Sequence, residues 1–177
     1  MVTFRRYDSR DGEAIRRLNS VAFRNNAVDP ADIPGIEDLD DVEGSYFDVG
    51  GAFLVGVATD EEVGEDWTAP AVHDGRLVAM GGFVPNRAGR DDERTVEGAV
   101  ELHRMRVTPE AHGAGYGREL LERLESAIRK TGLDPILATT SKRQRRAVEF
   151  YEAAGYDRVA ESTDGDYELV HFEKSLR

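Results

Sequence analysis

The sequence predicts a single domain of the α/β class, and three observations lead to this prediction. Short segments rich in apolar and β-branched residues, typical of strands, alternate with amphipathic patterns typical of helices. The chain has 177 residues, of which 40% are hydrophobic, and this is enough for one sizeable core. No linker-like segment or internal repeat divides the chain, so we expect one domain covering residues 1–177.

The N-terminal half predicts three strands and one clear helix. The strands are expected at residues 3–7, 52–57 and 76–84, and Pro85 ends the last of them. Asp8 or Ser9 is expected to cap a helix whose apolar residues recur at helical spacing as far as Phe23. Between these elements lie an acidic stretch at 29–48 with a short helix near 36–42, a polar insertion at 60–70 and a turn at 73–75.

The C-terminal half begins with a loop at 89–92 and a strand at 96–107, which stops at Thr108-Pro109. An amphipathic helix of roughly four turns follows, with Leu120, Leu124 and Ile128 on its apolar face. We then expect a strand at 136–140 and a short helix that ends at Gly155. A hairpin with strands near 156–160 and 167–172 closes the chain.

The connection between the strand at 96–107 and the next helix is rich in glycine. Gly113, Gly115 and Gly117 remove side chains where the backbone turns, so free N–H groups at the helix start can converge on an anion. A P-loop is excluded because Arg118-Glu119 follows where Lys-Ser or Lys-Thr is needed. The spacing also differs from a dinucleotide fingerprint, and the chain is too short for a kinase. A pyrophosphate site remains, against the alternative of a plain connection without a ligand.

This segment resembles the pyrophosphate motif of the GNAT superfamily of acetyl-CoA-dependent N-acetyltransferases. The family pattern Arg/Gln-x-x-Gly-x-Gly/Ala is matched by the run from His112 to Gly117, and Val107-Thr-Pro-Glu110 precedes it as in relatives. Only the first position departs from the pattern. A histidine ring can still donate a hydrogen bond but lacks the fixed charge of arginine. His112 therefore predicts weaker or pH-sensitive binding of the cofactor.

A second segment strengthens the resemblance. The run from Gln144 to Tyr156 is similar to the family signature Asn-x-x-Ala-x-x-Phe-Tyr-x-x-x-Gly-Phe, with Ala147, Phe150 and Tyr151 at the matching positions. Taken alone, Tyr151 would be a core aromatic residue with a satisfied hydroxyl group. With both motifs present in the family's order, the resemblance implies that Tyr151 is the general acid.

The resemblance also implies a GNAT fold, a mixed and mostly antiparallel sheet with helices on both faces. Acetyl-CoA would be the co-substrate, its pantetheine arm bonded by the strand backbone near Met105 and Val107, where relatives have a bulge and a splay between neighbouring strands. Arg118 is either a phosphate ligand or a plain helix-surface arginine. The residues expected to bind the cofactor are Met105, Arg106, Val107, His112, Gly113, Ala114, Gly115, Tyr116, Gly117, Arg118 and Gln144.

The expected chemistry needs a base for the amine and an acid for the departing thiolate. Glu101 lies where many relatives carry a base carboxylate, although it could also be a solvated residue at a strand end. His103 is the second candidate base, because histidine titrates near neutrality. Regular alternation along the strand places Glu101, His103, Met105 and Val107 on one face. The alternative function is a catalytically inactive acyl-CoA-binding sensor or partner module.

Composition limits the remaining possibilities. The absence of cysteine excludes a cysteine acyl-enzyme and favours direct transfer in a ternary complex, and the four histidines lack metal-ligand spacing. The net charge is −12, and only three of the 23 basic residues are lysines, a composition similar to that of halophilic cytoplasmic proteins. We expect a cytoplasmic protein without nucleic-acid or membrane partners, an acceptor that is a small-molecule or peptide amine, and a homodimer as one possible assembly.

Overall fold

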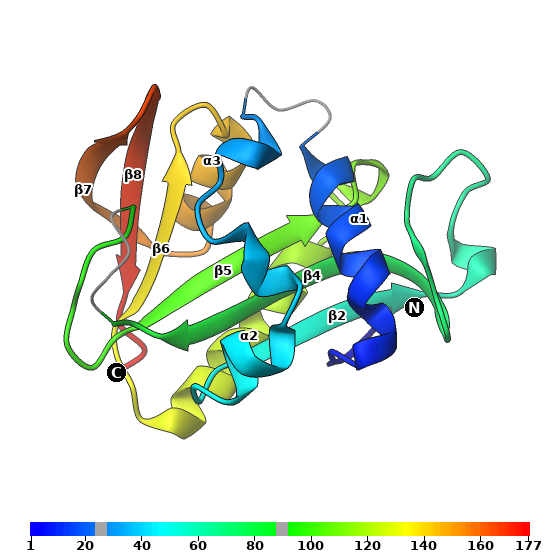
Figure 1. Cartoon of the computed structure of the whole chain (residues 1–177), viewed down its shortest axis with the longest axis horizontal. Helices are drawn as coiled ribbons and strands as arrows, with labels where there is room; N and C mark the ends of the chain where they lie inside the picture. The colour runs from blue at the N-terminus through cyan, green and yellow to red at the C-terminus, as the bar shows by residue number, and fades with distance from the viewer. Residues whose placement is uncertain (24–27, 88–91) are drawn as a thin grey trace.

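The computed structural model describes residues 1–23, 28–87 and 92–177 (Figure 1). Most of the loop expected at 89–92 therefore lies outside the described residues. The strands are β1 (Thr3–Arg6), β2 (Ala52–Ala58), β3 (Ala71–Val72), β4 (Gly75–Pro85), β5 (Val100–Val107), β6 (Ile136–Ser141), β7 (Asp157–Asp164) and β8 (Tyr167–Lys174). The α-helices are α1 (Gly12–Ala22), α2 (Tyr116–Thr131) and α3 (Arg145–Ala153). Short helical turns are η1 (Ser9–Asp11), η2 (Pro30–Asp32), η3 (Ile36–Leu39), η4 (Glu43–Phe47), η5 (Asp60–Glu62) and η6 (Pro109–Ala111).

The strands form one mixed sheet in the order β1-β2-β4-β5-β6-β8-β7, with β3 paired to β4. All neighbouring pairs are antiparallel except β5 and β6, which run parallel. The crossover between the two parallel strands contains α2, as a parallel connection requires. The predicted class, a mostly antiparallel mixed sheet within one α/β domain, is confirmed.

Helices cover both faces of this sheet (Figure 1). On one face α1 buries Ile15 and Leu18 against Val55 and Leu77 of the central strands. On the other face the apolar residues of α2 and α3 pack on β4, β5, β6 and β8, and they include the predicted Leu120, Leu124 and Ile128. Burial of these apolar stripes is the main term that holds the helices to the sheet.

Two segments differ from the predictions. The strand expected from residue 96 begins only at Val100, because the Asn86 side chain accepts from Val96 N at 2.7 Å and the Ala99 N–H turns back to the Val96 carbonyl. The helix expected at 36–42 ends earlier, as η3, and a separate turn, η4, follows it. The Asp41 side chain accepts from Gly44 N at 3.0 Å and so starts a new turn there.

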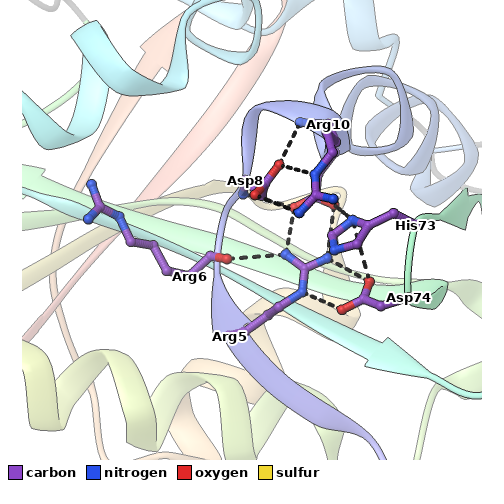
Figure 2. Close-up of polar contacts among 7 residues, drawn as sticks. Arg5, Arg6, Asp8, Arg10, His73 and Asp74 are labelled. Atoms are coloured by element: carbon purple, nitrogen blue, oxygen red, sulfur yellow. Dashed lines mark hydrogen bonds and ion pairs between the residues drawn. The ribbon is translucent and has the colours of Figure 1, made fainter.

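An ion-pair network ties the first strand to the start of α1. Arg5 of β1 donates to both carboxylate oxygens of Asp11, at 2.7 and 2.9 Å, and to both of Asp74, at 2.7 and 2.8 Å. Figure 2 shows the Arg5 guanidinium between Asp74 and the turn that carries Asp8 and Arg10. Asp11 is fully buried and caps the turn by accepting from Asp8 N. A buried carboxylate of this kind depends on its arginine partner.

The feature that shapes the rest of the molecule is a β-bulge in β5. Arg104 has a left-handed φ of 56°, and the pairing with β4 shifts by one residue between Met80 and Gly82. Beyond Glu101, β5 also leaves β6, since only Val100 and Glu101 are paired to it. Figure 1 shows the two strands diverging toward their C-terminal ends. The bulge and splay that the family resemblance implied are both present.

The bulge corrects the predicted faces of this strand. Met105 and Val107 pack into the core on the α2 side. His103 instead lies edge-on to Tyr46 on the α1 side, and Arg106 bonds to Asn19 of α1. The prediction that His103, Met105 and Val107 share one face is therefore wrong, because one extra residue at Arg104 reverses the alternation after it.

Candidate functional site

A cavity of about 720 Å³ opens where β5 and β6 separate. Its walls come from the second half of β5, the glycine turn and first turn of α2, the C-terminal half of β6, and α3. The end of α1 and the segment at 32–34 close the opposite side. Two motifs that are about thirty residues apart in the sequence thus line one space.

The glycine turn presents open backbone to this cavity. Gly113 and Gly115 have left-handed φ values of 84° and 89°, which a residue with a side chain adopts only under strain. A Cβ added to either would meet no atom within 4 Å, so the space beside the turn is free. Gly115 is the N-cap of α2, whose first N–H groups have no partners within the helix. The turn therefore has the form of an anion-binding site.

His112, the departure from the family pattern, is held beside this turn. Its Nε2–H donates to the Val107 carbonyl at 3.2 Å. Partial burial and then the positive charge of Arg146 lower the pKa of His112, so that the ring is neutral at pH 7. Arg146 is exposed at the start of α3 and also lines the cavity. The fixed charge that relatives carry at the position of His112 is thus available nearby from Arg146.

Glu101 lies at the point where β5 and β6 part, and only 1% of its surface is exposed. Asn86 Nδ2 and Thr139 Oγ1 donate to its two oxygens, each at 3.4 Å. Thr139 Oγ1 lies 2.9 Å from Nδ1 of His171, whose Nε2 lies 2.7 Å from Ser162 Oγ. If the threonine proton points to Glu101, then His171 donates from Nδ1 and accepts at Nε2. Glu101 is buried and bonded; the solvated alternative does not hold.

His103 lies on the same stretch of β5 but is engaged elsewhere. Its Nε2 lies 2.6 Å from a carboxylate oxygen of Glu93, and both side chains are nearly buried. The partner orients the ring toward the loop before β5. His103 lines the cavity near Glu101, yet its closest polar contact is with Glu93.

Tyr151 is a residue of α3, and its ring is buried. The ring packs on Phe150, Tyr156 and Phe172 at centroid distances of 5.4 to 5.5 Å. Its hydroxyl makes no hydrogen bond within the described part of the chain, and no buried side-chain N or O among the described residues lacks one. The hydroxyl must therefore be open to the cavity that Tyr151 lines. Burial raises the pKa of Tyr151, while the positive charge of Arg106 lowers it. The group stays protonated at neutral pH.

Nearly all of the site residues predicted from the sequence line the cavity. All of the predicted catalytic and cofactor-binding residues line it except Ala114. Gln144 does so while its Oε1 accepts from Thr140 at 2.6 Å. Arg118 is largely exposed and donates to Glu122 at 3.0 Å, as a helix-surface arginine does, although it also borders the cavity. Gly155 has the left-handed φ, 84°, expected at the end of α3.

Sequence reasoning missed the residues that support Glu101. Asn86 directly follows the strand stop at Pro85, and Thr139 lies inside the strand expected at 136–140. His171 had no motif around it. No local signal links them, because Thr139 and His171 become direct partners only through the register of the antiparallel pair β6 and β8.

A sheet split by a bulged strand, with a glycine turn at a helix start beside the gap, is the architecture of an acyltransferase that uses acetyl-CoA. The family model described as the acetyltransferase (GNAT) family matches residues 37–156. The chain belongs to this family.

Individual relatives agree with this assignment. A curated "IAA acetyltransferase" of Azospirillum brasilense is 33% identical to this chain over 86 residues. The matched segment covers 49% of this chain and 51%, about half, of the length of that relative. An acetyltransferase of the GNAT family from Staphylococcus aureus Mu50 has the same fold, with a TM-score of 0.76 at 16% identity over the whole of both chains. A Salmonella typhimurium structure, assigned as an acetyltransferase and containing its cofactor acetyl-CoA, gives 0.67 at 20% identity, covering 100% of this chain and 95% of its own.

Within residues 1–23, 28–87 and 92–177, no helix combines the length and the apolar character needed to cross a bilayer. The same residues contain no group of three or more His, Cys, Asp and Glu side chains arranged to hold a metal ion.

Proposed function

We propose that this protein transfers the acetyl group of acetyl-CoA directly to a primary amine within a ternary complex. One observation carries the proposal: the buried carboxylate of Glu101, the open hydroxyl of Tyr151 and the glycine turn face a single cavity. The first two supply a base and an acid, and the third supplies a place for an anionic pyrophosphate. With no cysteine in the chain, a cysteine acyl-enzyme is unavailable.

The residues present fit acetyl-CoA. The empty space beside Gly113 and Gly115 leaves room for phosphate groups, and Arg146 adds a positive charge. Met105, Arg106 and Val107 lie past the point where β5 leaves β6, so their backbone groups on that edge are not used by β6. They are suited to bonding an extended pantetheine arm. When bound, the cofactor supplies an activated acyl thioester.

The reaction forms one C–N bond and breaks one C–S bond. Glu101 accepts a proton from the incoming ammonium or amine, directly or through a water molecule. Tyr151 donates its hydroxyl proton to the sulfur that leaves, and it regains a proton from solvent after release of the products. His103 is the alternative base. Its ion pair with Glu93 would have to open before it could take a proton from an acceptor.

The first experiment is calorimetric titration with acetyl-CoA at high salt. Gly115→Glu should abolish binding, because its side chain and charge would enter the pyrophosphate space. Gly132→Glu is the matched control: Gly132 caps the other end of α2 with a similar φ of 74° and similar free space. Loss of binding in both variants, or in neither, would contradict the proposed cofactor site.

Release of free thiol from acetyl-CoA, measured over a panel of amines, then separates the enzyme from the alternative. An enzyme releases thiol in proportion to added acceptor and yields the N-acetyl product by mass spectrometry. A protein that binds acetyl-CoA tightly but releases no thiol with any amine would be the sensor or partner module. The cytoplasmic location of this protein and its assembly as a homodimer stay predictions from the sequence.

A further inference from the structure

The α1 side of the cavity contains two arginines, Arg104 and Arg106, whose guanidinium groups have different hydrogen-bond partners. Arg104, at the bulge, donates from Nε to both oxygens of Asp38, at 3.0 and 3.1 Å, and from Nη2 to the Pro34 carbonyl. Its charge is neutralised. Arg106, two residues later, donates from Nε to the Asn19 side chain at 3.2 Å and from Nη1 to its neighbour's carbonyl, that of Met105, at 2.9 Å. Within the described residues, no carboxylate pairs with Arg106.

The Arg106 guanidinium is enclosed by its surroundings. It lies 4.5 Å from the centre of the Phe23 ring, stacked over it. Burial lowers its pKa to about 10, and the nearby charge of Arg104 adds to the effect. Arg106 is half-buried, and within the described residues its guanidinium has no carboxylate partner, so it can pair with a carboxylate that a ligand brings.

One face of this guanidinium is available to a ligand. Nη2 of Arg106 makes no hydrogen bond within the described part of the chain, and no buried side-chain nitrogen or oxygen there lacks a partner. Nη2 is therefore not sealed by protein, and Arg106 lines the cavity. Tyr151 and Glu101 line the same cavity as Arg106.

We infer that the acceptor is an amine that also carries a carboxylate, an amino-acid-like molecule whose carboxylate pairs with Arg106 while its amine faces Glu101 and Tyr151. This inference rests on the proposed acetyl transfer. A guanidinium is suited to the role because its planar donors match a carboxylate. Polyamines and other wholly cationic acceptors would meet the like charge of the half-buried Arg106 and are disfavoured.

The test compares three matched acceptors under saturating acetyl-CoA, following release of free thiol. They are an L-amino acid, its carboxamide and the corresponding decarboxylated amine. The set of three is repeated for amino acids with the common apolar and polar side chains. The amide has the more weakly basic amine and so more free amine at pH 8, which by itself would favour it. A kcat/KM for the acid at least tenfold above that of the amide is the expected result.

The variant Arg106→Gln should lower kcat/KM for the acid about 100-fold and abolish the preference for the acid over the amide. Arg106→Lys keeps the positive charge but lacks the planar pair of donors of a guanidinium. This variant should recover part of the preference for the acid that Arg106→Gln loses. Arg123→Gln is the control, since Arg123 is an exposed arginine of α2 paired with Glu119 outside the cavity. It should leave the acid-to-amide ratio unchanged.

The outcomes separate this inference from the proposed function. Equal activity on acids and amides in the wild-type protein overturns the inference while leaving acetyl transfer intact, and this measurement decides the matter even if the Arg106 variants do not fold. An equal loss on all acceptors in Arg106→Gln, with acetyl-CoA binding retained, also overturns it. Absence of thiol release with every amine would instead be a failure of the proposed function.

Discussion

Replacing Tyr151 with phenylalanine removes one oxygen atom and tests the proposed chemistry. The ring contacts with Phe150, Tyr156 and Phe172 remain, because they involve the aromatic faces and edges. The hydroxyl makes no hydrogen bond to the described residues, so its loss should cost less than about 1 kcal/mol of folding free energy. The variant is therefore expected to fold and to bind acetyl-CoA as the wild-type protein does.

The expected loss of activity follows from the role of a general acid. Positioned proton transfer accounts for roughly 100- to 10,000-fold in rate, equivalent to about 3–5 kcal/mol of barrier. Burial raises the Tyr151 pKa, so the wild-type group is protonated throughout the neutral range and can donate. We therefore expect kcat to fall by at least 100-fold while the dissociation constant of acetyl-CoA changes by less than about twofold.

Stopped assays of thiol release give kcat, and calorimetric titration gives the binding constant. Tyr156→Phe is the matched control, because its hydroxyl donates to Glu125 Oε1 of α2 at 3.0 Å and neither residue lines the cavity. That variant should lose some stability and keep its kcat. If Tyr151→Phe retains more than about a tenth of the wild-type kcat, Tyr151 is not the general acid.

Three further predictions concern other groups. Glu101→Gln should keep acetyl-CoA binding in titration and lower kcat, with the deficit shrinking at high pH as more acceptor amine loses its proton without help; an unchanged kcat would exclude Glu101 as the base. Arg5→Met leaves fully buried Asp11 without its partner and should cost about 3 kcal/mol, a fall in Tm of roughly 6–12 °C by calorimetry, whereas Arg10→Ala, at an exposed pair, should change Tm little. Burial lowers the pKa of His171, so the folded state disfavours its protonation. Above the ordinary pKa the ring is neutral in both states and contributes nothing, and as the pH falls below about 6.5 stability is lost; in His171→Gln the fall in Tm between pH 7 and 5 should be shallower, and an unchanged slope would count against this cause.

Much of the fold could be predicted because its signals are local. The spacing of Leu120, Leu124 and Ile128 marks the buried stripe of α2, and Gly155 marks the end of α3. The glycine turn and the Tyr151 motif also lie where the sequence placed them, on one cavity. Each of these features depends on residues within a few positions of one another.

The errors have a different origin. The start of β5 was misplaced because Asn86, which is ten residues away along the chain, takes the hydrogen bond that a ladder would otherwise use. The helix predicted at 36–42 stops at Leu39, and the Asp41 side chain takes the Gly44 N–H where the separate turn η4 begins. Hydrophobic patterning does not record such polar competition, so strand and helix ends are where it fails.

The sequence by itself determined the family, the glycine turn and the identity of the acid and base candidates, since these depend on residue types at fixed local spacing. Only the tertiary structure decided which groups meet. The left-handed Arg104 reverses the faces of β5, so that Arg106 enters the α1 side of the cavity, where none of the described carboxylates pairs with it. The Thr139–His171 pair behind Glu101 exists because β6 and β8 adopt one register. Register and bulges are set by the packing of the whole sheet, and a linear pattern carries no measure of that packing.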